Sequence, residues 1–548
     1  MINNKSRKDE KAKLINSGKF VLNERRAQID NLDALPMWDR GLIDYKKYHQ
    51  YVGQSGIRYE MTIQGTRGCP FRCFYCDVQH ITPFHRRRSA ENIFEEVKYL
   101  SSLGVKRIEF IDDAFNVNIK EFKHFFKMII DSKLDVQFYF QSGLRGDLLD
   151  PESIDMMWWG GVKSVNLSLE SASPRLQKLM CKNLNIEKLH SNLTYIVEKY
   201  PYLIVGLNAM HGFPTETEAE AQMTIEFIKD IKWLHFVQLH NVRIFPGSLL
   251  EKIALENGVT REQIEESLTL PYHLIPTTIQ LDKDFSRRIR LDFVKNYLFN
   301  RERLKYILTK QIEVCTEDEL MYKYRTVFPT RINTLDDILK LGRLTKDDIN
   351  WGKMKAEEPC TIRYPQLKEK KKLRKEGDSY KILFLDISQF FSEEITVEIK
   401  AVEPPLGHIA IVSYLNEKFG DMIEARICKS GVDFDSVEEL CSILDMFEPD
   451  LIGMRTMTYY KKFFSFIIQE IRSHGCKAPI IAGGPHPTIV PEQCLRENDI
   501  QLVSIGEGEK TWEEIIQRIL NNHNKFLSKD MMYHIKGIAF LDDDCRKK

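Results

Sequence analysis

The sequence has no surplus of charge, no long apolar run and no second group of closely spaced cysteines. Its 548 residues hold 79 Lys and Arg and 79 Asp and Glu, so the formal net charge is +0. A chain without a basic surplus is poorly suited to neutralising phosphates, which argues against a nucleic-acid partner. No run approaches the roughly 18 apolar residues of a membrane span, and the first residues lack the apolar core of a signal peptide. We therefore expect a cytoplasmic protein without a membrane span.

Three of the 11 cysteines stand close together, as Cys69, Cys73 and Cys76, and the others are scattered singly. Three neighbouring thiolates can hold one inorganic centre, and a four-iron cubane held by three cysteines has one iron without a protein ligand. A small molecule can bind at that iron and accept an electron. Zinc is the alternative, because His80 or His85 would complete a Cys3His set. A disulfide is disfavoured, since such spacing in a cytosolic chain suggests metal or redox chemistry.

Strands and helices alternate from Tyr59 to about residue 245, which indicates parallel strands covered by helices. We expect six strand–helix units, short of the eight of a closed barrel, and therefore an α/β fold with an open, partial (β/α)6 barrel. Functional sites of such folds lie at the carboxyl ends of the strands. The polar residues at these ends are Asp112, Asp113, Gln141, Ser142, Arg145, Glu170, Ser171 and His211.

The alternation stops after the barrel and resumes near Lys381, where five strands with intervening helices predict a flavodoxin-like, doubly wound sheet. Gly483-Gly484 and Gly506-Glu507-Gly508 lie at strand ends, where glycine lets the backbone approach a ligand or makes a tight turn. Neither matches the G-x4-G-K-[ST] phosphate loop. The predicted organisation is an N-terminal segment joining the two domains (1–58), the barrel (59–245), a helical extension (246–350), a charged linker (351–380) with a solvated Lys-rich run (368–376), and the second domain (381–548).

The cysteine segment resembles the cluster loop of the radical SAM superfamily, whose C-x3-C-x-aromatic-C pattern is matched by Cys69, Cys73, Tyr75 and Cys76. The resemblance implies a 4Fe-4S cluster on the three cysteines and S-adenosylmethionine (SAM) on the open iron. Reduction would cleave SAM to a 5'-deoxyadenosyl radical. The electron would come from a donor such as flavodoxin or ferredoxin.

Three further segments resemble motifs of the same superfamily. Glu109–Phe115 resembles the second-strand motif at the SAM amino group, Asn166–Ser173 the fourth-strand motif at the ribose, and Gly206–Thr217 the fifth-strand motif near the adenine. The last departs from the usual pattern at Asn208 and Ala209, where many relatives have an apolar residue and a glycine. The SAM contacts implied by the resemblance are Tyr75, Asp112, Asp113, Ser142, Arg145, Ser168, Glu170 and His211.

Most of residues 381–521 resembles the cobalamin-binding domain of cobalamin-dependent radical SAM enzymes. The matching segments are Glu403–Gly407, Gly453–Thr458, Ala482–Thr488 and Gly506–Thr511. The D-x-H-x-x-G motif is absent, so no histidine is expected to ligate cobalt from below; His408 and His486 are interpreted as loop or helix-start residues. The implied cobalamin contacts are Glu403, Pro404, Gly407, Met454, Thr456, Gly483, Gly484, Gly506, Glu507 and Gly508.

The order of the domains is unusual for this family, because most relatives have the cobalamin domain first. The segment from Gly18 to Asp39 resembles the piece that usually follows that domain, and Lys536–Asp544 resembles the beginning of the same piece. The chain is therefore interpreted as a circular permutation. We predict that Gly537–Leu541 pairs antiparallel with Lys19–Asn23; the alternative is an unrelated C-terminal strand.

The resemblance implies methylation of an unactivated carbon in a small molecule or natural-product intermediate. Three alternatives stay open from the sequence. The enzyme could instead catalyse a cobalamin-dependent radical cyclisation or rearrangement, its second domain could be a vestigial or regulatory module, or the protein could be a cobalamin or redox sensor. The sequence does not name the substrate.

Overall fold

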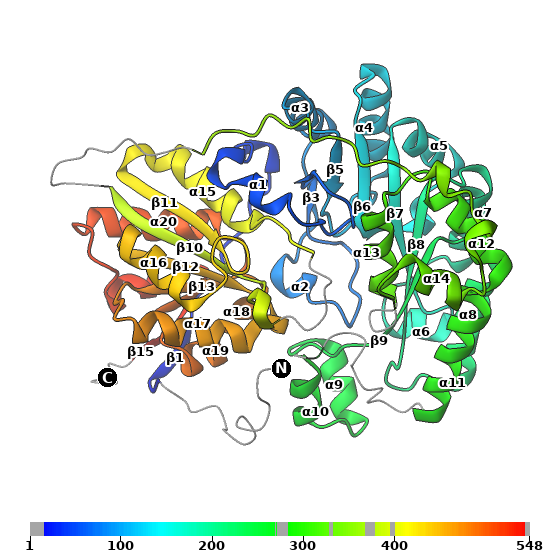
Figure 1. Cartoon of the computed structure of the whole chain (residues 1–548). Helices are drawn as coiled ribbons and strands as arrows, with labels where there is room; N and C mark the ends of the chain where they lie inside the picture. The colour runs from blue at the N-terminus through cyan, green and yellow to red at the C-terminus, as the bar shows by residue number, and fades with distance from the viewer. Residues whose placement is uncertain are drawn as a thin grey trace.

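The computed structural model describes residues 16–268, 270, 283–327, 332–367, 379–394 and 401–542. Two α/β units lie side by side in it, one around each sheet (Figure 1). In the described part of the chain, no helix is both long and apolar enough to cross a membrane. The Lys-rich run at 368–376 lies outside the described residues.

The first unit contains a parallel sheet with the strand order β2-β5-β6-β7-β8-β9, in which β2 and β9 are the edges. The sheet is therefore an open partial barrel of six strands, as predicted. The strands are β2 Glu60–Ile63, β5 Arg107–Phe110, β6 Gln137–Leu144, β7 Val162–Glu170, β8 Ile204–His211 and β9 Phe236–Asn241. The covering helices are α3 Ala90–Ser102, α4 Ile119–Ser132, α5 Pro151–Trp159, α6 Pro174–Leu179, α7 Ile186–Lys199 and α8 Glu218–Asp230.

Local sequence explains where these helices begin. The side chains of Ser89, Asn118 and Thr217 each accept the N–H three residues further on, which satisfies a backbone donor that the first turn leaves unpaired. The outer face of the sheet is apolar; Met61, Ile108 and Phe110, for example, are almost fully buried beneath the helices. The period-two alternation of the strands places the opposite side chains in the barrel interior.

A helical segment follows β9 and packs against the barrel (Figure 1). Arg107 of β5 forms a buried ion pair with Glu319, at 2.7 Å, and the Tyr297 hydroxyl donates to the carbonyl of Ile231 at 2.7 Å. These contacts fix the segment on the barrel. Its elements are α9 Leu249–Glu256, α10 Arg261–Leu268, α11 Lys283–Phe293, the π-helix Val294–Leu298, α12 Arg301–Gln311, α13 Glu317–Val327 and α14 Leu335–Leu341.

The second unit contains five parallel strands in the order β14-β13-β12-β10-β11, which is the flavodoxin-like arrangement predicted from the sequence. The strands are β10 Tyr380–Ile387, β11 Ile423–Lys429, β12 Leu451–Thr456, β13 Ile480–Gly483 and β14 Leu502–Ser504. The helices are α15 Leu406–Phe419, α16 Val437–Phe447, α17 Lys461–Ser473, α18 Pro485–Ile489, α19 Pro491–Glu497 and α20 Glu509–Asn521.

The two ends of the described chain share this second sheet. β15 (Ile538–Asp542) pairs antiparallel with β1 (Lys19–Leu22), with Val21 opposite Phe540. The predicted pairing of these segments is confirmed. The prediction did not include a second contact, in which β15 also pairs antiparallel with β14 and so lies between β14 and β1. The sheet therefore has seven strands.

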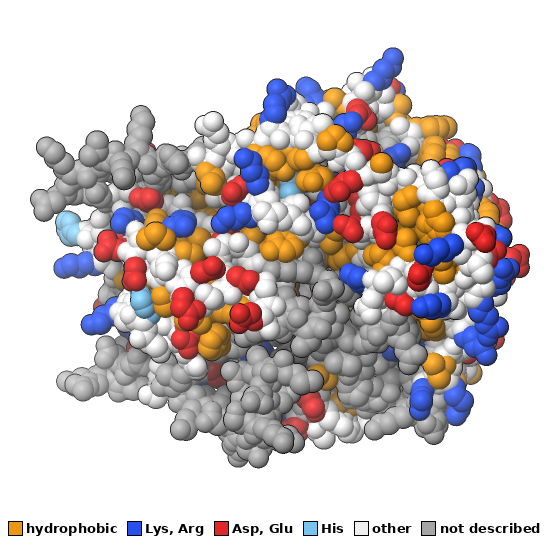
Figure 2. Space-filling model, viewed as in Figure 1, with side chains coloured by type: hydrophobic (Ala, Val, Ile, Leu, Met, Phe, Trp, Pro, Cys, Tyr) orange, Lys and Arg blue, Asp and Glu red, His pale blue; other side chains and the backbone are white. Residues whose placement is uncertain are grey.

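The surface carries mixed charges. Among the described residues on the face shown in Figure 2, Lys and Arg side chains lie among Asp and Glu side chains. This distribution agrees with the equal numbers of acidic and basic residues in the sequence. A mixed face offers little electrostatic attraction to a polyanion.

Candidate functional site

The cysteine loop follows β2 and is enclosed by local structure. A short hairpin, β3 (Thr66–Arg67) with β4 (Arg86–Arg87), brackets the loop and the helix α2 (Val78–Ile81). The Gln79 side chain donates to the carbonyls of Cys69 at 2.6 Å and Phe71 at 2.8 Å. All three cysteines are partly exposed and free of disulfides. The backbone is thus held in place while the thiols stay accessible.

Phe74, between the second and third cysteines, anchors the loop to the barrel. Its N–H donates to the carbonyl of Met180 at 3.0 Å, and its carbonyl accepts the N–H of Leu250 at 3.1 Å. Its ring stacks on Phe213, with centroids 6.0 Å apart. Phe74 therefore belongs to a small apolar core under the loop, which orients the neighbouring cysteines.

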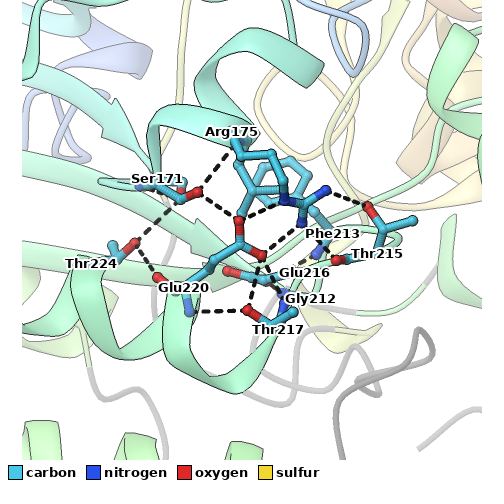
Figure 3. Close-up of polar contacts among 11 residues, drawn as sticks. Ser171, Arg175, Gly212, Phe213, Thr215, Glu216, Thr217, Glu220 and Thr224 are labelled. Carbon is cyan, nitrogen blue, oxygen red and sulfur yellow. Dashed lines mark hydrogen bonds and ion pairs between the residues drawn. The ribbon is translucent and has the colours of Figure 1, made fainter.

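A polar network holds Phe213 beneath the loop (Figure 3). The Glu216 carboxylate accepts the N–H groups of Gly212 and Phe213 just after β8. Glu220, in the first turn of α8, forms an ion pair with Arg175, and Arg175 donates to the Thr215 carbonyl at 2.7 Å. The turn after β8 is thereby fixed to α6 and α8. This also fixes Phe213, on which the Phe74 ring stacks.

The thiols are poorly suited to carrying charge without a metal. Burial raises the pKa of all three, that of Cys76 to about 12, and neighbouring cysteines add to the effect for Cys69 and Cys76. In the part of the chain that is described, no three His, Cys, Asp or Glu side chains converge on one ion. A zinc ion needs such convergence, whereas a cubane binds each thiolate at a different iron. Three thiolates match the three irons of a cubane that take a protein ligand.

Glu170 ends β7 beside the cysteine loop and holds two partners from other segments. Its carboxylate accepts Lys182 Nζ at 2.8 Å and the Tyr75 hydroxyl at 3.3 Å. Glu170 has a φ of 64°, a conformation that costs free energy for a residue other than glycine and often marks a functional position. Glu170 and Tyr75 were predicted from the sequence, whereas Lys182, which is buried in the turn after α6, matches no motif and was not predicted.

Arg145 and Asp112 also lie beside the loop, but their hydrogen bonds are made within the protein. The Arg145 guanidinium lies 3.9 Å from the centre of the Phe71 ring and pairs with Asp147 at 2.9 Å. Asp112 accepts the Gly65 N–H at 3.1 Å and the Thr66 hydroxyl at 2.6 Å. Both residues support the loop directly. Their contact with SAM stays a prediction.

The remaining predicted SAM residues are spread around the barrel rim. Asp113 lines the space between the two units, and Ser142 and Ser168 lie at the ends of β6 and β7. His211 is buried at the end of β8, where its Nε2 accepts a hydrogen bond from Arg290 Nε at 2.9 Å. Burial lowers the pKa of His211 to about 3, so the ring is neutral. Contact of these four residues with SAM also stays a prediction.

The barrel interior contains an unusual pair of buried carboxyl groups. Glu60 and Glu109 lie on the adjacent strands β2 and β5, and both oxygens of Glu109 lack a hydrogen-bond partner among the described residues. Burial raises the pKa of Glu60 to about 8 and that of Glu109 well above its usual range, and Glu403 adds to both shifts. The folded protein therefore holds protons here that the unfolded chain releases.

These raised pKa values predict that stability falls as pH rises. Between the unfolded pKa near 4.5 and about 8, the folded state binds more protons, so the free energy of unfolding decreases with pH. One such group contributes at most about 1.4 kcal/mol per pH unit. Glu60→Gln should therefore be more stable than the wild type at pH 8 and equal to it at pH 5, in urea unfolding at both pH values. The exposed Glu95→Gln is the control, and a Glu60→Gln curve parallel to the wild type would contradict the assignment.

A cavity of about 240 Å³ lies between the two units. The cysteine loop and the end of β5 contribute Arg67, Gly68 and Asp113 to its wall. Thr456, in contrast, is buried and its hydroxyl donates to the Ile387 carbonyl at 3.0 Å; neither it nor Glu403 or Pro404 is part of the lining. The predicted cobalamin residues that do line the cavity are Gly407, Met454, Gly483, Gly484, Gly506, Glu507 and Gly508.

The glycines leave this wall open to a ligand. A Cβ atom added at Gly407 or Gly483 would meet its nearest neighbour only at 3.9 or 3.8 Å, so a side chain there would occupy cavity space. The absence of side chains at these strand ends lets a bulky group approach the backbone. A complete cobalamin is larger than this cavity of about 240 Å³, and contact of the lining with cobalamin stays a prediction.

An ion-pair cluster joins the two units at the rim of the cavity. Arg86 pairs with Glu507, and Arg67 pairs with Glu509 at 2.7 Å and with Glu507 at 3.6 Å. Both arginines belong to the β3–β4 hairpin that brackets the cysteine loop, and both glutamates lie where α20 begins. We call these four residues the inter-domain clamp. It connects the predicted cobalamin loop Gly506–Gly508 directly to the cysteine loop.

His408 lines the same cavity from the first turn of α15. Its side chain is almost completely buried, and its ring lies 5.2 Å from that of Phe384. Burial lowers the pKa of His408 to about 4, so the imidazole is neutral at physiological pH. The cavity wall thus includes a neutral imidazole as well as glycines.

Comparison with known families agrees with this geometry. Residues 63–228 match the radical SAM superfamily, and residues 393–516 match the B12 binding domain. An uncharacterised methyltransferase of Pyrococcus horikoshii is 28% identical over 245 residues, which cover 44% of this chain and 51% of the relative. A tRNA-2-methylthio-N(6)-dimethylallyladenosine synthase of Thermotoga petrophila is 29% identical over 170 residues, 30% of this chain and 38% of the relative. The chain thus spans about half or less of the length of these two relatives.

Two solved structures match this chain at low similarity. The radical SAM methyltransferase TsrM from Kitasatospora setae, with tryptophan and a SAM analogue bound, has 18% identity and a TM-score of 0.34. The match covers 40% of this chain and 42% of the TsrM chain. The cobalamin-dependent radical SAM enzyme OxsB, with aqua-cobalamin and SAM bound, has 17% identity and a TM-score of 0.27. The match covers 42% of this chain and 35% of the OxsB chain. The two matched domains imply a 4Fe-4S cluster, SAM and cobalamin as cofactors. The chain therefore contains a radical SAM domain followed by a B12-binding domain.

Proposed function

We propose that the enzyme methylates an unactivated carbon of a small molecule or natural-product intermediate. The observation that carries the proposal is the cavity that the cysteine loop and the glycine-lined strand ends of the B12-binding domain share. The relative from Pyrococcus horikoshii, described as a methyltransferase, supports the same reaction class. The SAM and cobalamin contacts named from the sequence are part of this proposal.

When bound, the cofactors supply a carbon radical and a transferable methyl group, and the protein supplies binding and orientation. The cysteines would hold the cluster at one side of the cavity. Glu170, oriented by Lys182 and Tyr75, would accept hydrogen bonds from the ribose hydroxyls of SAM. The inter-domain clamp would hold the two sides together and exclude water, which prevents side reactions of a radical.

Two further parts of the proposal concern the surroundings of the enzyme. The cluster needs a low-potential electron, so we propose a flavodoxin or ferredoxin as the donor. A reducing cytoplasm is the proposed location, because such a donor and free thiols are found there. The substrate is proposed to be a small molecule, since the cavity shared by the two units has a volume of only about 240 Å³.

The test is a product count with SAM carrying a labelled methyl group. The anaerobic, reconstituted enzyme is incubated with reductant and an extract of the producing cell. Methyl transfer predicts a labelled product together with S-adenosylhomocysteine and 5'-deoxyadenosine. 5'-Deoxyadenosine without S-adenosylhomocysteine would overturn the proposal in favour of cyclisation or rearrangement. A protein that binds the cofactors but consumes no SAM would point to a sensor.

A further inference from the structure

His408 differs from the rest of the cavity wall in having an unused metal-binding group. The residue is 4% exposed, and its Nδ1 is buried without a hydrogen-bond partner among the described residues. A buried ring nitrogen without a partner is costly, because it has left water and gained no hydrogen bond in return. Such a side chain in a cavity wall indicates a group that a bound ligand satisfies.

The surroundings of His408 orient the ring without binding it. Phe384 packs against one side of the imidazole, with the ring planes 50° apart. Asp386, whose charge acts on His408, is held by Arg455 at 3.0 Å and Lys429 at 3.3 Å. The carboxylate is therefore already occupied by two cations. It acts on His408 as a charged neighbour and leaves the ring nitrogens available.

The ligand expected in this cavity contains a metal that accepts imidazole. Cobalt lies at the centre of cobalamin, and neutral imidazole nitrogen is the commonest protein ligand of such metals. We propose that His408 coordinates the cobalt of the bound corrinoid as its axial ligand on the face turned toward the B12-binding domain. The proposal reverses the expectation, drawn from the missing D-x-H-x-x-G motif, that no histidine binds cobalt in this chain.

His486 provides a matched comparison within the same domain. It is 5% exposed and lies in α18, close to the glycines at the end of β13. It does not belong to the cavity lining, whereas His408 does. The two histidines are thus alike in burial and differ in access to the cavity, so only His408 is expected to reach the metal.

Electron paramagnetic resonance of the full-length protein loaded with cob(II)alamin tests the proposal without turnover. An axial nitrogen splits each cobalt line of the spectrum into three. Protein labelled with [15N]histidine should convert these triplets into doublets, which separates a histidine of the protein from the base of cobalamin itself. His408→Gln should lose the splitting, and His486→Gln should keep it. Cob(II)inamide, which carries no base, should show the same splitting with the wild type.

Each outcome decides the question. Absence of nitrogen splitting in the wild type, or splitting that [15N]histidine does not change, overturns the proposal. If both variants lost the splitting, the loss would be explained by a general disruption of the protein, and this too would overturn the proposal. The cobalamin content of each purified variant is measured as well. This measurement distinguishes a variant that has lost cobalamin from one that binds cobalamin without a nitrogen ligand on the cobalt. The inference rests on cobalamin binding, and its failure would leave methyl transfer untouched.

Discussion

Replacing Cys73 with alanine should abolish formation of 5'-deoxyadenosine and remove the iron–sulfur absorption of the reconstituted protein. Two thiolates are too few for a cluster that keeps one iron open to SAM, because the cubane then has a second iron without a protein ligand. We expect turnover to fall below detection, at least 1,000-fold by analogy with the loss of other essential catalytic groups, about 10³ or more. Iron content and 5'-deoxyadenosine yield, measured anaerobically, check the prediction.

Cys441→Ala is the matched control for this experiment. Cys441 is half-buried in α16 of the other unit, and alanine is a better helix former than cysteine. The control should retain its cluster and its activity. A Cys73→Ala protein that keeps the full iron content would contradict the assignment of the cluster to the Cys69–Cys76 loop.

Arg86→Gln in the inter-domain clamp should lower stability and weaken cobalamin retention together. The Arg86 side chain is 7% exposed and that of Glu507 is 13% exposed. The substitution therefore leaves the Glu507 carboxylate without its main partner at a site that is largely shielded from solvent. Removing one member of a buried ion pair typically costs about 3–5 kcal/mol. For a domain of this size, that corresponds to a fall in melting temperature of roughly 10 °C. Calorimetry and the cobalamin content after gel filtration measure the two effects.

A double variant separates the charge effect from simple loss of packing. Arg86→Gln combined with Glu507→Gln removes both charges and should recover part of the lost stability. Lys127→Ala serves as the surface control, because its pair with Asp131 is more than 60% exposed on both sides and should contribute less than about 1 kcal/mol. If Arg86→Gln cost no more than Lys127→Ala, the clamp would not join the two units energetically.

Local patterns predict much of this fold. The alternation of strands and helices, the capping residue Ser89 and the glycines after β13 are all signals carried by neighbouring residues. The pairing of β15 with β1 was also predictable, although these strands lie at opposite ends of the chain. Each strand resembles one part of the segment that follows the cobalamin domain in most relatives. The cysteine loop itself is a compact motif and could be located without a structure.

The contacts that organise the site could not be predicted in this way. Arg67 and Glu509 are 442 positions apart, and nothing in the periodicity near either residue indicates the other. Lys182 lies in a turn without a motif, so its contact with Glu170 depends on how α6 returns to the end of β7. Such pairs arise from the docking of whole elements, which short sequence patterns do not encode.

The position of β15 has a consequence for how the protein is made in the cell. β1 is synthesised about 520 residues before β15, its pairing partner. At translation rates of about 5–20 residues per second, β1 waits roughly half a minute to two minutes for β15. During that time the barrel can fold, whereas β1 has no partner, because the other strands of its sheet lie between Tyr380 and Asp542 and are made last. A newly made chain therefore has a long period in which β1 is an unpaired strand, and chaperone binding or aggregation should be concentrated there.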